Sequence, residues 1–119
     1  MERIFKRKLY AKLLDWKRTS NGKTALLIEG ARRVGKSTLV EQFAQQEYDT
    51  YILVDFNKAP KHIKELFEDL TDLSKIFLRL QQHYHIILKP RKSVIVFDEV
   101  QNCPLARQAI KYLVQDGRY

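Results

Sequence analysis

The chain has 119 residues, of which 45% are hydrophobic and 30% are charged, a balance typical of one soluble domain that buries a real core. Its longest apolar runs, at 24–28, 51–54 and 94–97, are far shorter than the roughly 20 residues that cross a bilayer, so we expect no membrane span. The first residues lack the apolar stretch of a secretory signal, and the single cysteine, Cys103, excludes an internal disulfide and a cysteine-based zinc site. Both observations favour a cytoplasmic protein.

The net charge of +8 is concentrated at the start of the chain. Residues 1–24 contain eight Lys or Arg and two acidic residues, a net +6, whereas residues 25–119 have a net +2. One interpretation is that these cations form the solvated face of an amphipathic helix. The alternative is that they bind nucleic acid phosphates or an acidic protein partner through long-range electrostatics.

Apolar side chains recur at helical spacing over residues 5–16, which predicts an amphipathic helix that the polar run 19–22 ends. Residues 24–29 predict a short buried strand. A loop bounded by two glycines follows at 30–35, and the next apolar pattern predicts a helix over 36–46. The first half of the chain is therefore expected to be helix, strand, loop and helix.

The second half continues this alternation. Residues 51–56 predict a second strand, and two helical patterns follow at 63–70 and 73–84, with Thr71 or Asp72 as the N-cap between them. Residues 93–98 predict a third strand, uninterrupted in its apolar centre as a strand covered on both faces should be.

A last helix is expected from Pro104 to Gly117. The sum is an α/β fold with a parallel sheet and helices on both faces, divided into a basic amphipathic helix at 1–22 and an α/β unit at 23–119.

The loop sequence GARRVGKS, residues 30–37, matches the pattern GxxxxGK[ST] in full. The predicted strand before it and helix after it allow backbone N–H groups to converge on a phosphate at the positive end of the helix. Gly30 and Gly35 permit backbone torsions and a close approach that a Cβ would obstruct. We therefore expect Lys36 to reach the β- and γ-phosphates of a nucleotide and the Ser37 hydroxyl to bind Mg²⁺.

The apolar run 94–97 ends in two acids, Asp98 and Glu99. In open α/β sheets ligands bind outside the carboxyl ends of the strands, so both acids are expected on the phosphate side. Asp98 is suited to hold Mg²⁺ through water, and Glu99 to polarise the attacking water. Asp55, at the end of the preceding predicted strand, is either a water-positioning carboxylate or a solvated strand end.

These residues resemble a known family. The motifs GARRVGKS and VIVFDE, the EVQ at 99–101 and the final ARQAIKYLVQDGRY are similar to AAA-type P-loop ATP-binding proteins of bacteria and archaea, in which a nuclease-like domain follows the ATPase module. The resemblance implies Mg²⁺-dependent ATP hydrolysis with Glu99 as base and Lys36 as a second catalytic group, and Ser37 and Asp98 at the metal. It implies that the phosphates lie against Gly30, Ala31, Arg32, Arg33, Val34, Gly35, Lys36, Ser37 and Thr38.

An acid directly after the Mg²⁺ aspartate is also typical of the additional-strand class of P-loop ATPases. In that class a further strand with a polar sensor residue lies between the phosphate-loop strand and the Asp-Glu strand, and this sequence contains no such strand and no helical lid. We therefore expect the N-terminal part of an ATPase domain, with two unpaired strand edges, marginal stability, self-association or direct pairing of those strands, and negligible turnover. Arg107 and Arg118 are the remaining candidates for an arginine finger, and an ordinary surface role is expected for both.

Three functions thus stay open. The first is ATP binding with Mg²⁺-dependent hydrolysis, and the second is a truncated nucleotide-binding or regulatory fragment without turnover. The third is a nucleic-acid-binding module that uses the basic helix at 1–22. A metal site at His83 and His85 is not expected, because the sequence supplies no cysteine cluster and no third ligand nearby.

Overall fold

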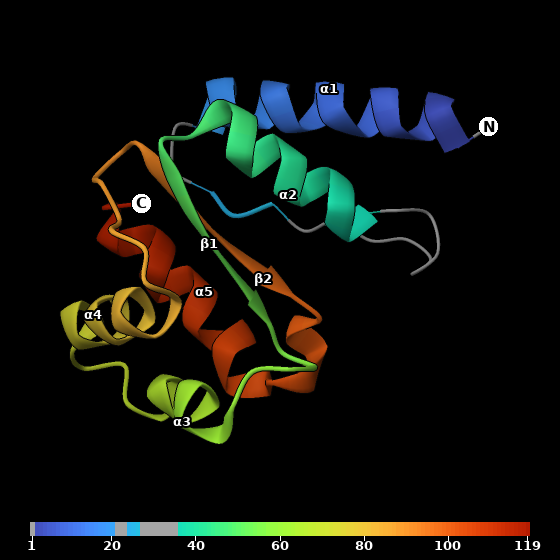
Figure 1. Cartoon of the computed structure of the whole chain (residues 1–119). Helices are drawn as coiled ribbons and strands as arrows, with labels where there is room; N and C mark the ends of the chain where they lie inside the picture. Colours follow the sequence, from blue (N-terminus) through green and yellow to red (C-terminus); the bar gives the residue numbers. More distant parts are fainter. Residues whose placement is uncertain (1, 21–23, 27–35) are drawn as a thin grey trace.

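The computed structural model describes residues 2–20, 24–26 and 36–119, with side chains from 7–20, 24–26 and 38–119. A parallel sheet lies between two layers of helices, α1 and α2 on one face and α3, α4 and α5 on the other (Figure 1). The elements are α1 (Glu2–Ser20), α2 (Lys36–Glu47), β1 (Thr50–Asp55), α3 (Lys61–Lys64), the 3₁₀ turn η2 (Glu65–Glu68), α4 (Leu73–Tyr84), β2 (Ser93–Asp98), the 3₁₀ turn η3 (Val100–Asn102) and α5 (Pro104–Asp116). No helix among the described residues is both long and apolar enough to cross a membrane.

The two described strands pair in parallel, from Thr50 opposite Ser93 to Asp55 opposite Asp98. A parallel pair needs a long crossover, and α3, η2 and α4 provide it. Both strands therefore end at the same edge of the sheet.

The hydrophobic core lies between the sheet and the layer of α3, α4 and α5. Every second side chain of the first strand and its extension, at Ile52, Val54 and Phe56, points into it and is at most 1% exposed. The rings of Phe56, Phe67 and Phe97 meet edge to face with centroids 5.2 to 5.9 Å apart. Such aromatic contacts add to the free energy that area burial alone provides.

On the opposite face α1 packs against α2 through a few large side chains. The Tyr10 ring meets Phe43 edge to face at 5.7 Å, and the Tyr10 hydroxyl donates to a Glu47 carboxylate oxygen at 3.0 Å. Leu13 is buried beside them. From residue 7 onward, α1 thus turns Tyr10 and Leu13 toward α2 and exposes Arg7, Lys8 and Lys12.

Most predicted elements are confirmed. The first helix ends at Ser20, the second starts at Lys36, the strands lie within one residue of 51–56 and 93–98, and the last helix begins at Pro104. The structure also confirms Asp72 as the N-cap of α4.

The helix predicted over 63–70 is wrong. One α-helical turn is followed by the 3₁₀ turn η2, and Asp69 is already extended, with φ −121° and ψ 107°. An Asp69 carboxylate oxygen accepts hydrogen bonds from both the backbone N–H and the hydroxyl of Thr71. This local bonding competes with the helical pattern, so the apolar periodicity does not decide the conformation.

The strand predicted over 24–29 is also wrong where it can be seen. Residues 24–26 have no strand conformation, because Thr24 is held against the end of α1 by hydrogen bonds of its N–H (2.9 Å) and hydroxyl (2.7 Å) to the Ser20 hydroxyl. Residues 27–29 lie outside the described residues. The third predicted strand, 93–98, has the expected bounds, but all of its residues except Ser93 are only partly buried. It is therefore not covered on both faces.

Candidate functional site

The carboxyl ends of the two strands bring carboxylates together. Asp55 and Asp98 are register partners, and the Phe56 N–H donates to the Asp98 C=O at 3.0 Å, which extends the ladder beyond the strand ends. Side chains alternate along a strand, and the neighbours Val54 and Phe97 point toward the core. Asp98 therefore points to the other face, where α2 lies.

The first turn of α2 is brought to the same edge. Only Tyr48 and Asp49 separate α2 from β1, so α2 ends where β1 begins. A helix of 12 residues is about 18 Å long and a strand of six residues about 20 Å, so α2 returns along the whole strand. Its N-terminus consequently lies on the side of the sheet where β1 and β2 have their carboxyl ends, as Figure 1 shows.

The phosphate-loop residues can be placed only in part. Gly30, Ala31, Arg32, Arg33, Val34 and Gly35 lie outside the described residues. Lys36 and Ser37 begin α2, with only their backbone described, and Thr38 is exposed in the same turn. The unpaired N–H groups and positive dipole end of a first helical turn favour an anion. The structure thus brings the start of α2 and the pair Asp98–Glu99 to one edge of the sheet.

Glu99 has an unusual backbone conformation. Its φ of 56° and ψ of 41° are left-handed, a region that costs a residue with a Cβ about 1 to 3 kcal/mol and is concentrated at functional sites. The 3₁₀ turn η3 holds this conformation, since the Asn102 N–H donates to the Glu99 C=O at 3.0 Å. The Gln101 side-chain amide donates to a Glu99 carboxylate oxygen.

Sequence reasoning missed two further polar residues at this edge. The side-chain amide of Asn102 donates to the side-chain oxygen of Asn57, and the Asn57 N–H donates to an Asp55 carboxylate oxygen at 2.9 Å. This bridge ties the turn after β1 to the turn after Glu99. The signal in the sequence is an amide residue shortly after each strand, which becomes informative only when the two strands are known to be neighbours.

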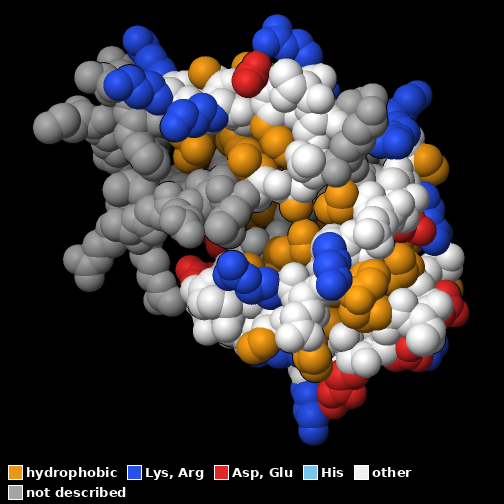
Figure 2. Space-filling model, turned by 180° about the vertical axis from the view of Figure 1, so that it is seen from behind, with side chains coloured by type: hydrophobic (Ala, Val, Ile, Leu, Met, Phe, Trp, Pro, Cys, Tyr) orange, Lys and Arg blue, Asp and Glu red, His pale blue; other side chains and the backbone are white. Residues whose placement is uncertain are grey.

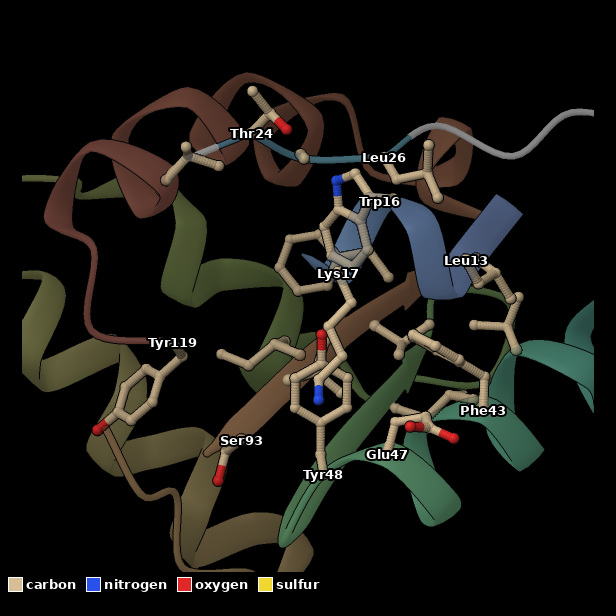
Figure 3. A pocket seen from close by; sticks show the side chains of 18 of the residues that line it. Leu13, Trp16, Lys17, Thr24, Leu26, Phe43, Glu47, Tyr48, Ser93 and Tyr119 are labelled. Atoms are coloured by element: carbon tan, nitrogen blue, oxygen red, sulfur yellow. The ribbon is translucent and has the colours of Figure 1, made fainter. Parts of the chain in front are cut away.

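A large groove opens beside β2 on the face of α1 and α2. Its volume is about 1280 Å³, and its walls come from α1, residues 24–26, α2, β2 and α5. Figure 3 shows Trp16 and Leu13 on one side and Ser93 and Tyr119 on another. Asp98 and Glu99 lie at the opposite end from Ser93, so the groove runs along the whole of β2 to the carboxyl edge.

Two polar side chains in the wall of the groove, Tyr48 and Trp16, are withdrawn from water. Burial, followed by the nearby Glu47 carboxylate, raises the pKa of Tyr48 to about 12, and the Lys17 ammonium lies 4.9 Å from the centre of the Tyr48 ring. The indole N–H of Trp16 is buried without a hydrogen-bond partner among the described residues. A buried hydrogen-bond donor without a partner is unusual in a well-packed protein interior.

The other candidates from the sequence have ordinary surroundings. Arg118 bonds Asp116 at 2.7 and 3.0 Å and lies over the Phe77 ring, which is a structural role, and Arg107 is exposed on α5. The His83 ring meets the His62 ring edge to face, with centroids 5.1 Å apart. The described residues contain no group of three His, Cys, Asp or Glu side chains that could hold a metal ion.

The basic residues of α1 agree with the solvated-face interpretation. Its described cations at Arg7, Lys8 and Lys12 are exposed, and Arg18 pairs with Asp15 at 2.8 Å.

The α/β fold and the arrangement at this edge fit a domain of the P-loop type. The family model described as "AAA domain" matches residues 22–119, so the chain belongs to the AAA domain family. No match was found among the curated proteins or among the solved structures.

Proposed function

We propose that the chain binds Mg²⁺-ATP at the carboxyl edge of the sheet and that this site is built for hydrolysis. The observation that supports the proposal is that the first turn of α2 lies on the side of the sheet where Asp98 and Glu99 end β2. Family membership supports nucleotide binding, and the motif residues supply the chemistry.

The phosphates would lie against residues 30–38, where backbone N–H groups and the Lys36 ammonium meet the negative charge. The donor set fits Mg²⁺, because Ser37 and Asp98 offer the oxygen ligands that this small hard cation prefers. When bound, Mg²⁺ neutralises charge that develops on the β- and γ-phosphates. Most of the catalytic effect then comes from positioning and from electrostatic stabilisation.

Glu99 would orient the attacking water and accept its proton. Its left-handed backbone and the turn η3 fix the start of the side chain, and Gln101 holds one carboxylate oxygen. The acid directly after Asp98 supports membership of the additional-strand class, in which a further strand completes the sheet. A non-hydrolysing, regulatory nucleotide-binding role is the alternative that a turnover measurement separates.

The test combines binding and turnover. Asp98→Asn and Glu99→Gln are compared with the wild type and with Gln108→Ala, a control at an exposed position of α5. We expect Asp98→Asn to weaken the Mg²⁺-dependent part of ATP binding. Glu99→Gln should retain binding and lose hydrolysis in any form of the protein that hydrolyses ATP, because the amide cannot accept the proton.

Unchanged Mg²⁺ dependence in Asp98→Asn, with folding intact by circular dichroism, would contradict the metal assignment. Wild-type turnover in Glu99→Gln would contradict the assignment of the base. An effect of Gln108→Ala as large as either would show that the assay reports general destabilisation.

A further inference from the structure

Two histidines from different helices meet at the surface of the layer formed by α3, α4 and α5. His62 lies in α3 and His83 in the last turn of α4. Their rings have centroids 5.1 Å apart and an interplanar angle of 73°. The third histidine of the chain, His85, follows His83 by two residues. Because the side chains of His62 and His83 are both exposed, an ion in solution can reach the two imidazoles.

Core residues hold the backbone on both sides of this contact. Ile63, directly after His62, is 1% exposed, and Leu80, one turn before His83, is fully buried. Tyr84, directly after His83, packs against the same core. The two helices therefore keep the two imidazoles at a fixed separation, although each ring can still turn about its soft χ2 torsion.

The separation of the rings matches that of two imidazoles on one tetrahedral metal ion. Zn²⁺–N bonds of about 2.0 to 2.1 Å place the centres of two bound imidazole rings roughly 5 Å apart. Imidazole is also a ligand that Zn²⁺, Cu²⁺ and Ni²⁺ favour, whereas Mg²⁺ prefers oxygen. The neighbouring cation, Lys61, lies 3.7 Å from a Glu65 carboxylate oxygen, so its charge is partly neutralised beside the two rings.

The pair is separate from the groove and from the carboxyl edge of the sheet. Neither histidine lines the groove beside β2, whose apolar hollow is seen from behind in Figure 2. The described residues contain no group of three His, Cys, Asp or Glu side chains suited to a metal, so the pair differs from a closed structural zinc site with four protein ligands. An ion bound to the pair would keep coordination positions for water.

We propose that His62 and His83 form an open, two-histidine site for a divalent transition ion, with Zn²⁺ as the ion that fits the ring spacing. One nitrogen of each ring would bind the ion, and water would complete its coordination. The bound ion would cross-link α3 to the last turn of α4, and so tie together the two ends of the helical crossover between β1 and β2. An ion that binds only the folded chain stabilises it.

Zn²⁺ titration of the whole chain tests the proposal, with nucleotide absent and Mg²⁺ in excess to occupy oxygen ligands. Calorimetry measures the affinity, and NMR follows the imidazole signals of the three histidines. We expect one Zn²⁺ to bind per chain and to shift the signals of His62 and His83. His62→Gln and His83→Gln should each weaken binding about tenfold or more, because the second imidazole no longer acts at a high effective concentration.

His85→Gln is the matched control, since it removes an exposed histidine two residues from the site. It should bind Zn²⁺ as tightly as the wild type, and Zn²⁺ should raise the urea midpoint of these two proteins but not of the His62 and His83 variants. An ordinary contact between two rings predicts no saturable Zn²⁺ binding by the wild type at millimolar concentration, and that result would overturn the proposal.

The variants provide two further outcomes that overturn it. One is wild-type affinity for Zn²⁺ in His62→Gln. The other is a loss in His85→Gln as large as that in His83→Gln, which would place the ion on His83 and His85 instead. None of these results depends on nucleotide binding, so the site at the carboxyl edge is tested separately.

Discussion

The two faces of the sheet differ in how completely they are closed. The face toward α3, α4 and α5 buries Ile52, Val54 and Phe56 in a continuous core with edge-to-face rings. On the face toward α1 and α2, β2 is partly exposed along a groove. The indole N–H of Trp16 is buried there without a hydrogen-bond partner among the described residues. The comparison teaches that the closed face holds the chain folded, while the open face contains the edge where the nucleotide site is proposed.

The largest expected effect is at the centre of the closed face. Phe56→Ala removes a fully buried ring that contacts Phe67 and Phe97, so we expect a loss of about 3 to 5 kcal/mol in the free energy of unfolding. That is a large part of the roughly 5 to 15 kcal/mol of an ordinary domain. Urea unfolding followed by circular dichroism measures it. A loss below about 1 kcal/mol would show that this core is not the main source of stability.

The same substitution on each strand compares the faces directly. Val54→Ala opens a cavity in the closed face and should cost about 2 kcal/mol, whereas Val96→Ala lies on the groove side and should cost about 1 kcal/mol or less. Equal losses in urea unfolding would mean that the groove is filled in solution. The difference between the two losses therefore measures how much less tightly the open face is packed than the closed face.

Alkaline pH tests the packing of α1 on the open face. The pKa of Tyr48 is raised to about 12, mainly by burial, so the folded state keeps the neutral phenol while the unfolded chain ionises near 10. This contribution to stability is complete below pH 10 and is lost as the pH rises toward 12. Tyr48→Phe should be less sensitive to pH in that window. Identical alkaline unfolding of both proteins would contradict the burial of Tyr48.

Acid pH tests the ion pair between Arg118 and Asp116, which precedes Tyr119, and here we expect the smallest effect. The hydrogen bonds from Arg118 hold the pKa of Asp116 below its usual value. The ion pair therefore stabilises the fold above the usual pKa of aspartate, and this stabilisation is lost as the pH falls through the lowered pKa. In urea unfolding at a series of pH values, Asp116→Asn should lose less stability on acidification than the wild type. Parallel curves would mean that the pair contributes nothing.

The sequence predicted those elements, on both faces of the sheet, whose formation local signals decide. Local signals sufficed for α2, both strands and the Asp72 cap, because periodicity and capping act within a few residues. They failed at 63–70, where hydrogen bonds of Asp69 to Thr71 override the apolar pattern, and at 24–26, where Ser20 holds Thr24. The burial of β2 could not be predicted, since it depends on what lies beside the strand.

In the candidate site, too, features that depend on neighbouring residues in the sequence were predictable, and features that depend on distant residues were not. The position of Asp98 and Glu99 at the carboxyl end of β2 was predictable, because an apolar run that ends in two acids predicts a strand with both acids at that edge. The bridge between Asn57 and Asn102 was not, because these residues are 45 positions apart and meet only through the register of the two strands. The left-handed backbone of Glu99 likewise has no signal in its own side chain.

Calorimetric titration with Mg²⁺-ATP tests the central claim most directly, namely that the edge where α2 begins and β2 ends binds the nucleotide. The wild-type chain should bind one ATP per chain, with a dependence on Mg²⁺, and Lys36→Ala should bind far more weakly while its circular dichroism and urea unfolding stay unchanged. Equal affinity of the two folded proteins for Mg²⁺-ATP would contradict the account.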